Sequence, residues 1–259
     1  MIRSQEIKEK AREYGVPTST IERDYAQNGL LKYLYHPNIV LKGGTGIKKA
    51  YHENYRFSDD LDFSLTHPIK DKELFTHINE AVDNAKEEVG IYFQISSKFA
   101  KTKTGFRGKI YFNMIQNATR TPLSIKVDIT NCYNEIILLP AEKKKVFHSY
   151  SDELNAEIEV YSLEEIFTEK IRALIQRTRA RDLYDTGMLY DLINKDKVLQ
   201  IIDKKFDFKG VILDISSLTK RKDDFSNAWD ASLRHQLKVI PDFEIFFNKV
   251  LTITSEIKT

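Results

Sequence analysis

Two aspartates separated by a single residue, Asp60 and Asp62, are the side chains best suited to metal-dependent chemistry. Alternate side chains of an extended strand share a face, so both carboxylates point one way with Ser64, while Leu61 and Phe63 point to the core. Their Cα atoms would lie roughly 6.5 to 7 Å apart, close enough for both carboxylates to bind one cation. Because like charges on one face destabilise a strand, the pair predicts a bound Mg²⁺ or Mn²⁺.

A second predicted strand, residues 123–130, has the same alternation and carries Asp128 on its outward face. Three carboxylates on neighbouring strands can hold two divalent ions about 3.5 to 4 Å apart, an arrangement that assists phosphoryl transfer. Asp128 is therefore a predicted third metal ligand, or the base that accepts the proton of an attacking hydroxyl. The alternative is that Asp60 and Asp62 only occupy a solvated strand end.

A double glycine precedes this acidic segment. Gly43, Gly44 and Thr45 follow a compact apolar run and are predicted to turn from a buried strand into a short helix that reaches Tyr51. Without Cβ atoms, such a turn lets backbone N–H groups approach a phosphate at the start of a helix. An ordinary strand-to-helix turn is the alternative.

Lys170, Arg177 and Arg181 are the basic residues best placed to meet a triphosphate. If one helix spanned all three, they would project within about 20° of one line, because each residue advances the helix by about 100°. Such a ridge would face phosphates. Ion pairs with nearby carboxylates, such as Asp182 and Asp185, are an equal alternative.

The overall composition is that of an ordinary globular chain of 259 residues with a formal net charge of +2, so any basic site must be local. Arg177, Arg179 and Arg181 are a candidate contact for nucleic-acid phosphates. The single Cys132 excludes an internal disulfide and a cysteine-rich zinc site. The N-terminus has no apolar h-region and no apolar run approaches about 18 residues, so we expect a cytoplasmic protein without membrane contact.

The elements that must position these residues change character along the chain. Ser19 with Glu22, and Ser162 with Glu165, have the spacing of a helix capping box. Strands are predicted at 38–41, 61–65, 91–95, 109–115, 123–130 and 157–161, and helices at 4–14, 19–35, 71–89, 163–178, 181–193, 196–205, 223–237 and 242–256, with the Lys-rich run 142–145 as a solvated loop or helix end. We therefore predict an α/β (α+β) domain over residues 1–160, followed by a helical bundle over residues 161–259.

Four segments together resemble the motifs of a known family. Residues 41–45 (LKGGT), 56–63 (RFSDDLDF), 169–174 (EKIRAL) and 181–185 (RDLYD) are similar, in order and spacing, to those of the AbiEii/AbiGii toxin family of nucleotidyltransferases, a branch of the polymerase-β-like superfamily. The resemblance implies a nucleotidyltransferase fold with a mixed sheet, joined to a C-terminal helical bundle. It also implies Mg²⁺-dependent transfer of a nucleotide from a nucleoside triphosphate, with release of pyrophosphate.

The resemblance further implies roles for individual residues. Metal ligation would belong to Asp60 and Asp62, and contact with the triphosphate to Lys170. The residues expected to bind the nucleotide are Gly43, Gly44, Thr45, Arg56, Ser58, Lys170, Arg177, Arg181, Asp182 and Asp185. Asp182 and Asp185 would orient Lys170 or line the side of the cleft that faces the base.

Partners also follow from the resemblance. Members of the family are toxins with a cognate antitoxin, and some relatives add nucleotides to the 3′ ends of tRNA, so RNA is the expected acceptor. Two alternatives stay open: a nucleotidyltransferase that modifies a small molecule, and a nucleotide-binding regulator that keeps the fold without the chemistry. The identity of the labelled product, or the absence of pyrophosphate release, would separate them.

Overall fold

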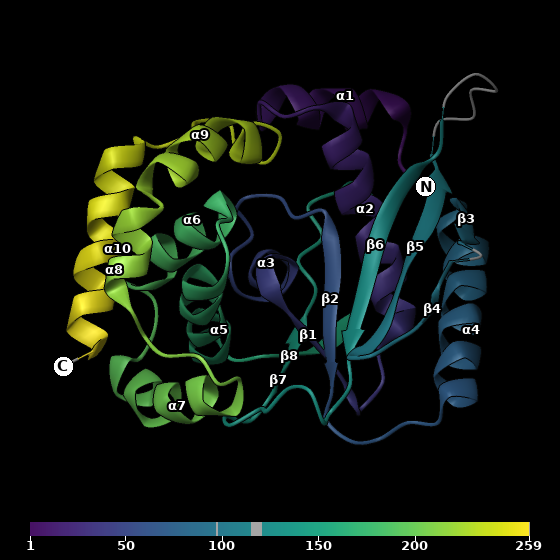
Figure 1. The fold of residues 1–259 in the computed structure, drawn as a ribbon. Coiled ribbons are helices and arrows are strands. Elements are labelled where there is room, and N and C mark those ends of the chain that lie inside the picture. The colour runs from purple at the N-terminus through teal and green to yellow at the C-terminus, as the bar shows by residue number, and fades with distance from the viewer. Residues whose placement is uncertain (97, 115–120, 259) are drawn as a thin grey trace. The chain divides into compact units, whose positions relative to one another are not determined.

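A computed structural model describes residues 1–96, 98–114 and 121–258. The Cα positions divide the chain into two compact units: residues 1–135 with 141–160, and residues 136–140 with 161–259. The first unit contains the strands of one mixed sheet, and the second is helical (Figure 1). The fold class predicted from the sequence is therefore confirmed. The division into a nucleotidyltransferase domain over residues 1–160 and a helical bundle domain over residues 161–259 stays a prediction.

The sheet of the first unit has the strand order β3-β5-β6-β2-β1-β8-β7, with β4 paired to β5. The pairs β2–β6 and β1–β8 are parallel, and the other neighbours are antiparallel. The strands are β1 Ile39–Lys42, β2 Asp60–Leu65, β3 Tyr92–Ile95, β4 Ala100–Thr102, β5 Gly105–Asn113, β6 Leu123–Thr130, β7 Glu142–Lys145 and β8 Glu157–Val160.

The helices α1 Ser4–Glu13, α2 Thr18–Leu34 and α4 Asp71–Val89 form the core of this unit with the inward-facing strand residues. The predicted alternation of β6 is confirmed, since Ile125, Val127 and Ile129 are buried. In β2 the prediction is wrong at Ser64, which is fully buried rather than solvated. α4 ends where Gly90 adopts a left-handed φ of 71°, a conformation that favours glycine.

Several local predictions for this unit need correction. Residues 142–145 form the edge strand β7, where exposed lysines discourage further strand pairing, instead of a loop or helix end. Ser19 lies inside α2, which begins at Thr18 without a side-chain cap, so the predicted capping box there is wrong. The predicted strand 109–115 begins earlier, at Gly105, and its last residue, Ile115, lies outside the described residues.

The second unit consists of α5 Leu163–Gln176, α6 Ala180–Leu189, α7 Lys195–Phe208, α8 Ile215–Lys220, α9 Lys222–Leu233 and α10 Phe243–Lys258. Ser162 caps α5 as predicted, since its hydroxyl accepts a hydrogen bond from the backbone N–H of Glu165 at 3.2 Å. The Glu165 carboxylate does not complete the box; it is buried and contacts Lys205 Nζ at 2.6 Å. Within the described residues, no helix is both long and apolar enough to cross a membrane.

Candidate active site

A row of four charged residues crosses the sheet of the first unit. Asp62 on β2 is in register with Lys42 on β1 and with Asp128 on β6, and Asp128 is in register with Arg107 on β5. Residues in register on neighbouring strands project from the same face, so the two carboxylates lie between two basic side chains. The row brings together two aspartates that are far apart in the sequence.

Asp60 lies one step along the same face, two residues before Asp62 on β2. Its register partner on β6 is Lys126, and its side chain is half-buried. Within the described residues, its carboxylate forms no ion pair. The backbone carbonyl of Asp60 accepts a hydrogen bond from the Thr45 hydroxyl, which joins the start of β2 to the glycine turn.

Asp128 is engaged by a neighbouring strand. Its Oδ2 accepts a hydrogen bond from Arg107 Nε at 2.6 Å and lies 2.6 Å from Arg107 Nη2. Among the residues that the structure describes, no three His, Cys, Asp or Glu side chains are grouped so that they could hold a metal ion. The arrangement therefore places Asp128 in the same row as Asp62, with its carboxylate directed to β5.

Asp60 and Asp62 alone supply a donor set that fits a hard cation. Both offer carboxylate oxygens, the ligands that Mg²⁺ and Mn²⁺ prefer. Space beside Asp62 depends on Gly43, because a Cβ on that glycine would lie 3.3 Å from Asp62 Oδ2. Gly43 also has a φ of 70°, which favours glycine.

The second glycine of the turn makes the same kind of close approach. A Cβ on Gly44 would lie 2.7 Å from Arg56 Nη2 and 3.1 Å from Ser58 Oγ. The turn therefore packs directly on the segment that carries the acidic pair. Its residues form the short helix α3 Gly43–Gly46, which continues into a π-helical turn, η1 Ile47–Tyr51, a rare geometry that often marks functional sites.

The segment before β2 is held by α2. Gln27 Nε2 donates a hydrogen bond to the carbonyl of Ser58 at 3.0 Å, and Arg23 Nη1 lies 2.9 Å from Asp59 Oδ1. Arg56 is only 3% exposed, and its Nη1 donates to the carbonyl of Phe57 at 3.1 Å. Arg56 is therefore a buried residue that holds the acidic segment in place, whereas Ser58 is partly exposed.

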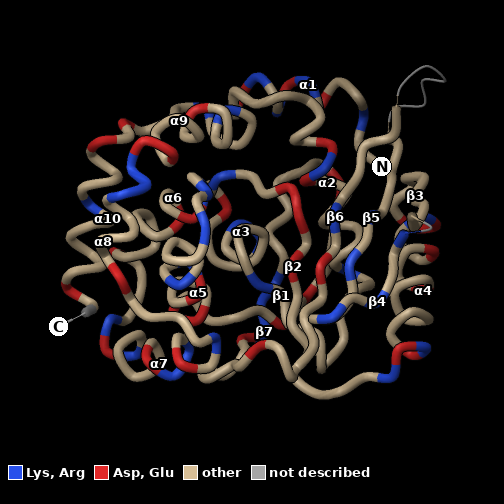
Figure 2. The backbone as a smooth tube through the Cα atoms, viewed as in Figure 1, with Lys and Arg blue, Asp and Glu red and all other residues tan. Residues whose placement is uncertain are grey.

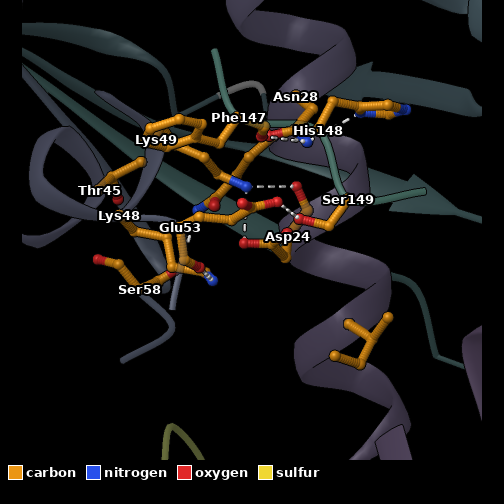
Figure 3. Close-up of polar contacts among 12 residues, drawn as sticks. Asp24, Asn28, Thr45, Lys48, Lys49, Glu53, Ser58, Phe147, His148 and Ser149 are labelled. Carbon is orange, nitrogen blue, oxygen red and sulfur yellow. Dashed lines mark hydrogen bonds and ion pairs between the residues drawn. The ribbon is translucent and has the colours of Figure 1, made fainter. Parts of the chain in front are cut away.

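A buried ion pair joins η1 to α2, and neither of its residues was among those predicted from the sequence (Figure 3). Lys49 Nζ lies 2.6 Å from Asp24 Oδ1 and donates a hydrogen bond to the Asp24 carbonyl at 3.0 Å. Burial lowers the pKa of Lys49 to about 8. Burial alone would raise the pKa of Asp24, but the charges of Lys49 and Lys48 outweigh it and hold that pKa below its ordinary value.

This pair anchors η1 to α2 and to the segment after β7. The Tyr150 hydroxyl donates to Asp24 Oδ2 at 2.8 Å, and Asn28 Nδ2 donates to the carbonyl of Phe147 at 3.3 Å. The available sequence signal was weak: the adjacent lysines Lys48 and Lys49 lie between two apolar residues, and a lysine that is buried needs a carboxylate partner. Its partner Asp24 is remote in sequence, so spacing did not reveal it.

In the second unit the motif residues form a charge cluster. Lys170 Nζ lies 2.8 Å from Asp182 Oδ1 and 2.7 Å from Asp185 Oδ2, and Arg177 Nε lies 2.9 Å from Asp182 Oδ2. Both aspartates are buried. Burial alone would raise the pKa of Asp182, but the charges of Lys170 and Arg177 outweigh it and lower that pKa. Both aspartates therefore contact the Lys170 ammonium group, and their role in orienting it stays a prediction.

The predicted ridge of Lys170, Arg177 and Arg181 is not formed. α5 ends at Gln176, and Arg177 has an extended backbone with φ −151° and ψ 159°. Arg181 lies on the separate helix α6, so the continuous helix that would align the three residues does not exist. For Lys170 and Arg177, the structure has the ion pairs that were the alternative to the ridge.

Known proteins of similar sequence or fold indicate the family of this chain. Residues 27–249 match the family model of the nucleotidyl transferase AbiEii toxin of type IV toxin–antitoxin systems. A search of curated proteins finds no significant match. Among solved structures, MenT4, a nucleotidyltransferase toxin from Mycobacterium tuberculosis H37Rv, superposes with a TM-score of 0.71 at 18% identity, over 100% of this chain and 90% of that one.

JHP933 from Helicobacter pylori superposes with a TM-score of 0.58 at 20% identity, and the match covers 93% of each chain. At these identities the two superpositions establish the shared fold, a mixed sheet followed by helices. The family model spans most of the chain, including the glycine turn, the acidic strand and the Lys170 cluster. The chain therefore belongs to the AbiEii nucleotidyl transferase toxin family of type IV toxin–antitoxin systems, and it is a nucleotidyltransferase.

Proposed function

We propose that this nucleotidyltransferase uses a divalent cation to transfer a nucleotide from a nucleoside triphosphate to a hydroxyl group of RNA, such as tRNA. The observation that carries the proposal is the placement of Asp60 and Asp62 on one face of β2, with Gly43 packed against Asp62 Oδ2. Two carboxylates beside a turn that lacks Cβ atoms supply oxygen ligands for a cation next to backbone that a phosphate can approach.

In the proposed reaction, the acceptor oxygen forms a bond to the α-phosphorus of the triphosphate. The bond from that phosphorus to the oxygen bridging the β-phosphate breaks, and pyrophosphate leaves with the electron pair. Mg²⁺ or Mn²⁺ bound by Asp60 and Asp62 would neutralise charge on the phosphates. Gly43, Gly44 and Thr45 hold the triphosphate, and their contribution is positioning, because each is fixed against the acidic segment.

Asp128 has two possible roles in this proposal: a third metal ligand, or the base that accepts the proton of the acceptor hydroxyl. Its contacts with Arg107 are both made through Oδ2. Oδ1 takes no part in these contacts, so it is available to accept the proton of an acceptor hydroxyl, and we propose this role for Asp128. Asp128→Asn should then reduce turnover while the apparent affinity for Mg²⁺ is unchanged.

The residues of the second unit stay predicted nucleotide contacts. Lys170 is already neutralised by Asp182 and Asp185, so its attraction for a triphosphate is weaker than that of an unpaired lysine. Arg177 is the more exposed member of the cluster. We expect Arg177→Gln to raise the KM for the triphosphate, and an unchanged KM would remove Arg177 from the site.

The toxin role implies a cognate antitoxin as partner, since the family is defined by toxin–antitoxin systems. Expression of the wild-type chain should arrest growth of a host cell, and expression of Asp62→Asn should not. Arrest by both chains would disconnect toxicity from nucleotide transfer.

The decisive experiment incubates the purified protein with each α-³²P-labelled nucleoside triphosphate, Mg²⁺ and total cellular RNA. We expect label on one size class of RNA, loss of label with Asp62→Asn, and loss with a chelator. Label on a small molecule would instead favour the alternative of a nucleotidyltransferase that modifies a small molecule. Triphosphate binding without pyrophosphate release, with any acceptor, would identify a regulator that retains only the fold.

A further inference from the structure

A basic groove lies on the sheet face of the first unit, over β3, β5 and β6. Its volume is about 780 Å³, and its lining includes Lys98, Arg107, Lys109, Tyr111 and Lys126. Figure 2 marks basic positions on β5 and β6 beside the acidic positions of β2. Arg107, Lys109 and Tyr111 alternate with buried residues along β5, so all three project from one face.

The groove contains a cross-strand pair of like charges. Lys109 on β5 is in register with Lys126 on β6. Like charges directly opposite each other destabilise an antiparallel pair. Among the described residues, neither ammonium group has an ion-pair partner, and the same holds for Lys98, which also lines the groove. A bound anion would offset this repulsion.

An aromatic side chain lies next to these charges. Tyr111 follows Lys109 by two residues, is partly exposed, and has Gln94 and Ser124 as register partners on either side. Bases of single-stranded nucleic acids stack on such aromatic rings, while lysines beside the ring contact the phosphates. Tyr111 therefore adds a feature that a site for a free phosphate does not need.

The acidic pair lies on the strand next to the groove. Asp60, Lys126 and Lys109 occupy one row across three adjacent strands, and Asp62, Asp128 and Arg107 occupy the next row. Neighbouring strands are about 4.8 Å apart, so Lys109 lies roughly 10 Å from Asp60 along this row. A chain whose phosphates lie over β5 and β6 would therefore bring its end to the carboxylates.

We propose that the β5–β6 groove binds the single-stranded end of the acceptor RNA, with Lys109 and Lys126 on its phosphates and Tyr111 stacked on a base. The inference rests on the proposed function for the identity of the acceptor. A small acceptor would need a compact pocket, whereas this groove extends away from Asp60 over three strands. Charge complementarity and the aromatic ring select single-stranded nucleic acid over an acidic small molecule.

The test measures binding separately from catalysis. The full chain, with no triphosphate present, is titrated with a fluorescein-labelled single-stranded RNA of mixed sequence over a range of salt concentrations. The variant is Lys109→Gln/Lys126→Gln. The control, Lys8→Gln/Lys72→Gln, removes the same charge from exposed positions on α1 and α4 that do not line the groove. Thermal unfolding verifies that both variants are folded.

Each phosphate contact contributes about 0.7 to the slope of log K against log salt for a single strand. Loss of two contacts should therefore reduce the magnitude of this slope by about 1.4. If the wild type and the variant bind equally at about 1 M salt, the variant should then bind about 25-fold more weakly than the wild type at about 0.1 M salt. Tyr111→Leu should weaken binding at least about fivefold without changing the slope, since it removes a stacked base and no charge. The control should bind as the wild type does.

If the wild type and Lys109→Gln/Lys126→Gln bind RNA with the same affinity and the same salt dependence, the groove does not bind RNA. This holds even if labelled nucleotide still appears on RNA. If the two substitutions weaken RNA binding but the wild type never labels RNA, the groove binds RNA and the proposed function is refuted. In a chain that does label RNA, the groove predicts a higher KM for RNA in Lys109→Gln/Lys126→Gln with little change in KM for the triphosphate. The reverse pattern would contradict it.

Discussion

The Lys170 cluster and the open face of β2, β6 and β5 use charged residues in opposite ways. In the cluster, Lys170 contacts Asp182 and Asp185 at 2.8 and 2.7 Å, and both aspartates are buried. On the sheet face, Asp60 and the opposed pair Lys109 and Lys126 have no ion-pair partners among the described residues, and all three are at least partly exposed.

The difference separates charges that hold the fold from charges that await a ligand. A buried charge needs a partner within the protein, because water is not available to solvate it. Unpaired charges on one face reduce stability slightly and are retained where a ligand supplies the missing partner. Substitutions in the cluster should therefore affect stability first, whereas substitutions on the sheet face should affect activity first.

The largest effect is expected for Lys170→Met. Removal of the ammonium group leaves Asp182 and Asp185 buried with one fewer partner, which should cost about 3 to 5 kcal/mol of the free energy of unfolding. Urea unfolding, monitored by circular dichroism, measures this loss of unfolding free energy. Lys220→Met, at an exposed position of α8, is the matched control and should change stability by about 0.5 kcal/mol at most. Equal effects of the two substitutions would remove the distinction between buried and exposed charges.

Asp60→Asn should have the opposite profile. Loss of one proposed cation ligand should reduce the rate of pyrophosphate release at least about 100-fold, the scale expected when a single group that stabilises transition-state charge is removed. The free energy of unfolding should be unchanged or slightly higher, because an unpaired negative charge is removed. A variant as active as the wild type would show that Asp60 holds no essential cation, and a strongly destabilised one would show that Asp60 is structural.

A smaller effect is expected for Gly44→Ala. The new Cβ would lie 2.7 Å from Arg56 Nη2, so the buried guanidinium must move. The resulting strain should cost about 1 to 3 kcal/mol. Differential scanning calorimetry measures the loss, and the KM for the triphosphate should rise because the turn and the acidic segment no longer fit. An unchanged melting temperature and an unchanged KM would mean that the Arg56 side chain can move without affecting stability or triphosphate binding.

The smallest effect concerns acid stability. The pKa of Asp182 is lower in the folded chain than in the unfolded chain, so the folded state binds fewer protons there. Its contribution to stability is complete above the unfolded pKa of about 3.9 and is lost as pH falls through the folded pKa. The difference in unfolding free energy between the wild type and Asp182→Asn should shrink below about pH 4. A difference that stays constant with pH would contradict the lowered pKa.

Several features of the site were predictable because they depend on local pattern. The alternation of polar and apolar residues placed Asp60 and Asp62 together on one face of a strand, and did the same for Asp128 on its own strand. Ser162 was recognised as a helix cap from its type and position. The helix over 71–89 was predicted with its observed ends, because its apolar face has a clear period.

Other features depended on partners that pattern does not reveal. Asp24 and Lys49 pair through space, and neither position signals the other. The end of α5 at Gln176 was not apparent, since residues 177–179 carry no Gly or Pro; the ion pair of Arg177 with Asp182 accompanies the extended backbone there. Ser64 resembled an outward-facing polar residue, but it is buried in the sheet.

The sequence by itself determined where most of the strands and helices lie, the edge strand β7 excepted, and that two carboxylates share a strand face, because these properties follow from the period of neighbouring residues. Tertiary structure decided that β2 pairs with β6, so that Asp62 and Asp128 fall in one row, and that Arg107 engages Asp128. It also placed Lys109 opposite Lys126. Strand order and register are set by packing between segments distant in the chain, and no local pattern encodes them.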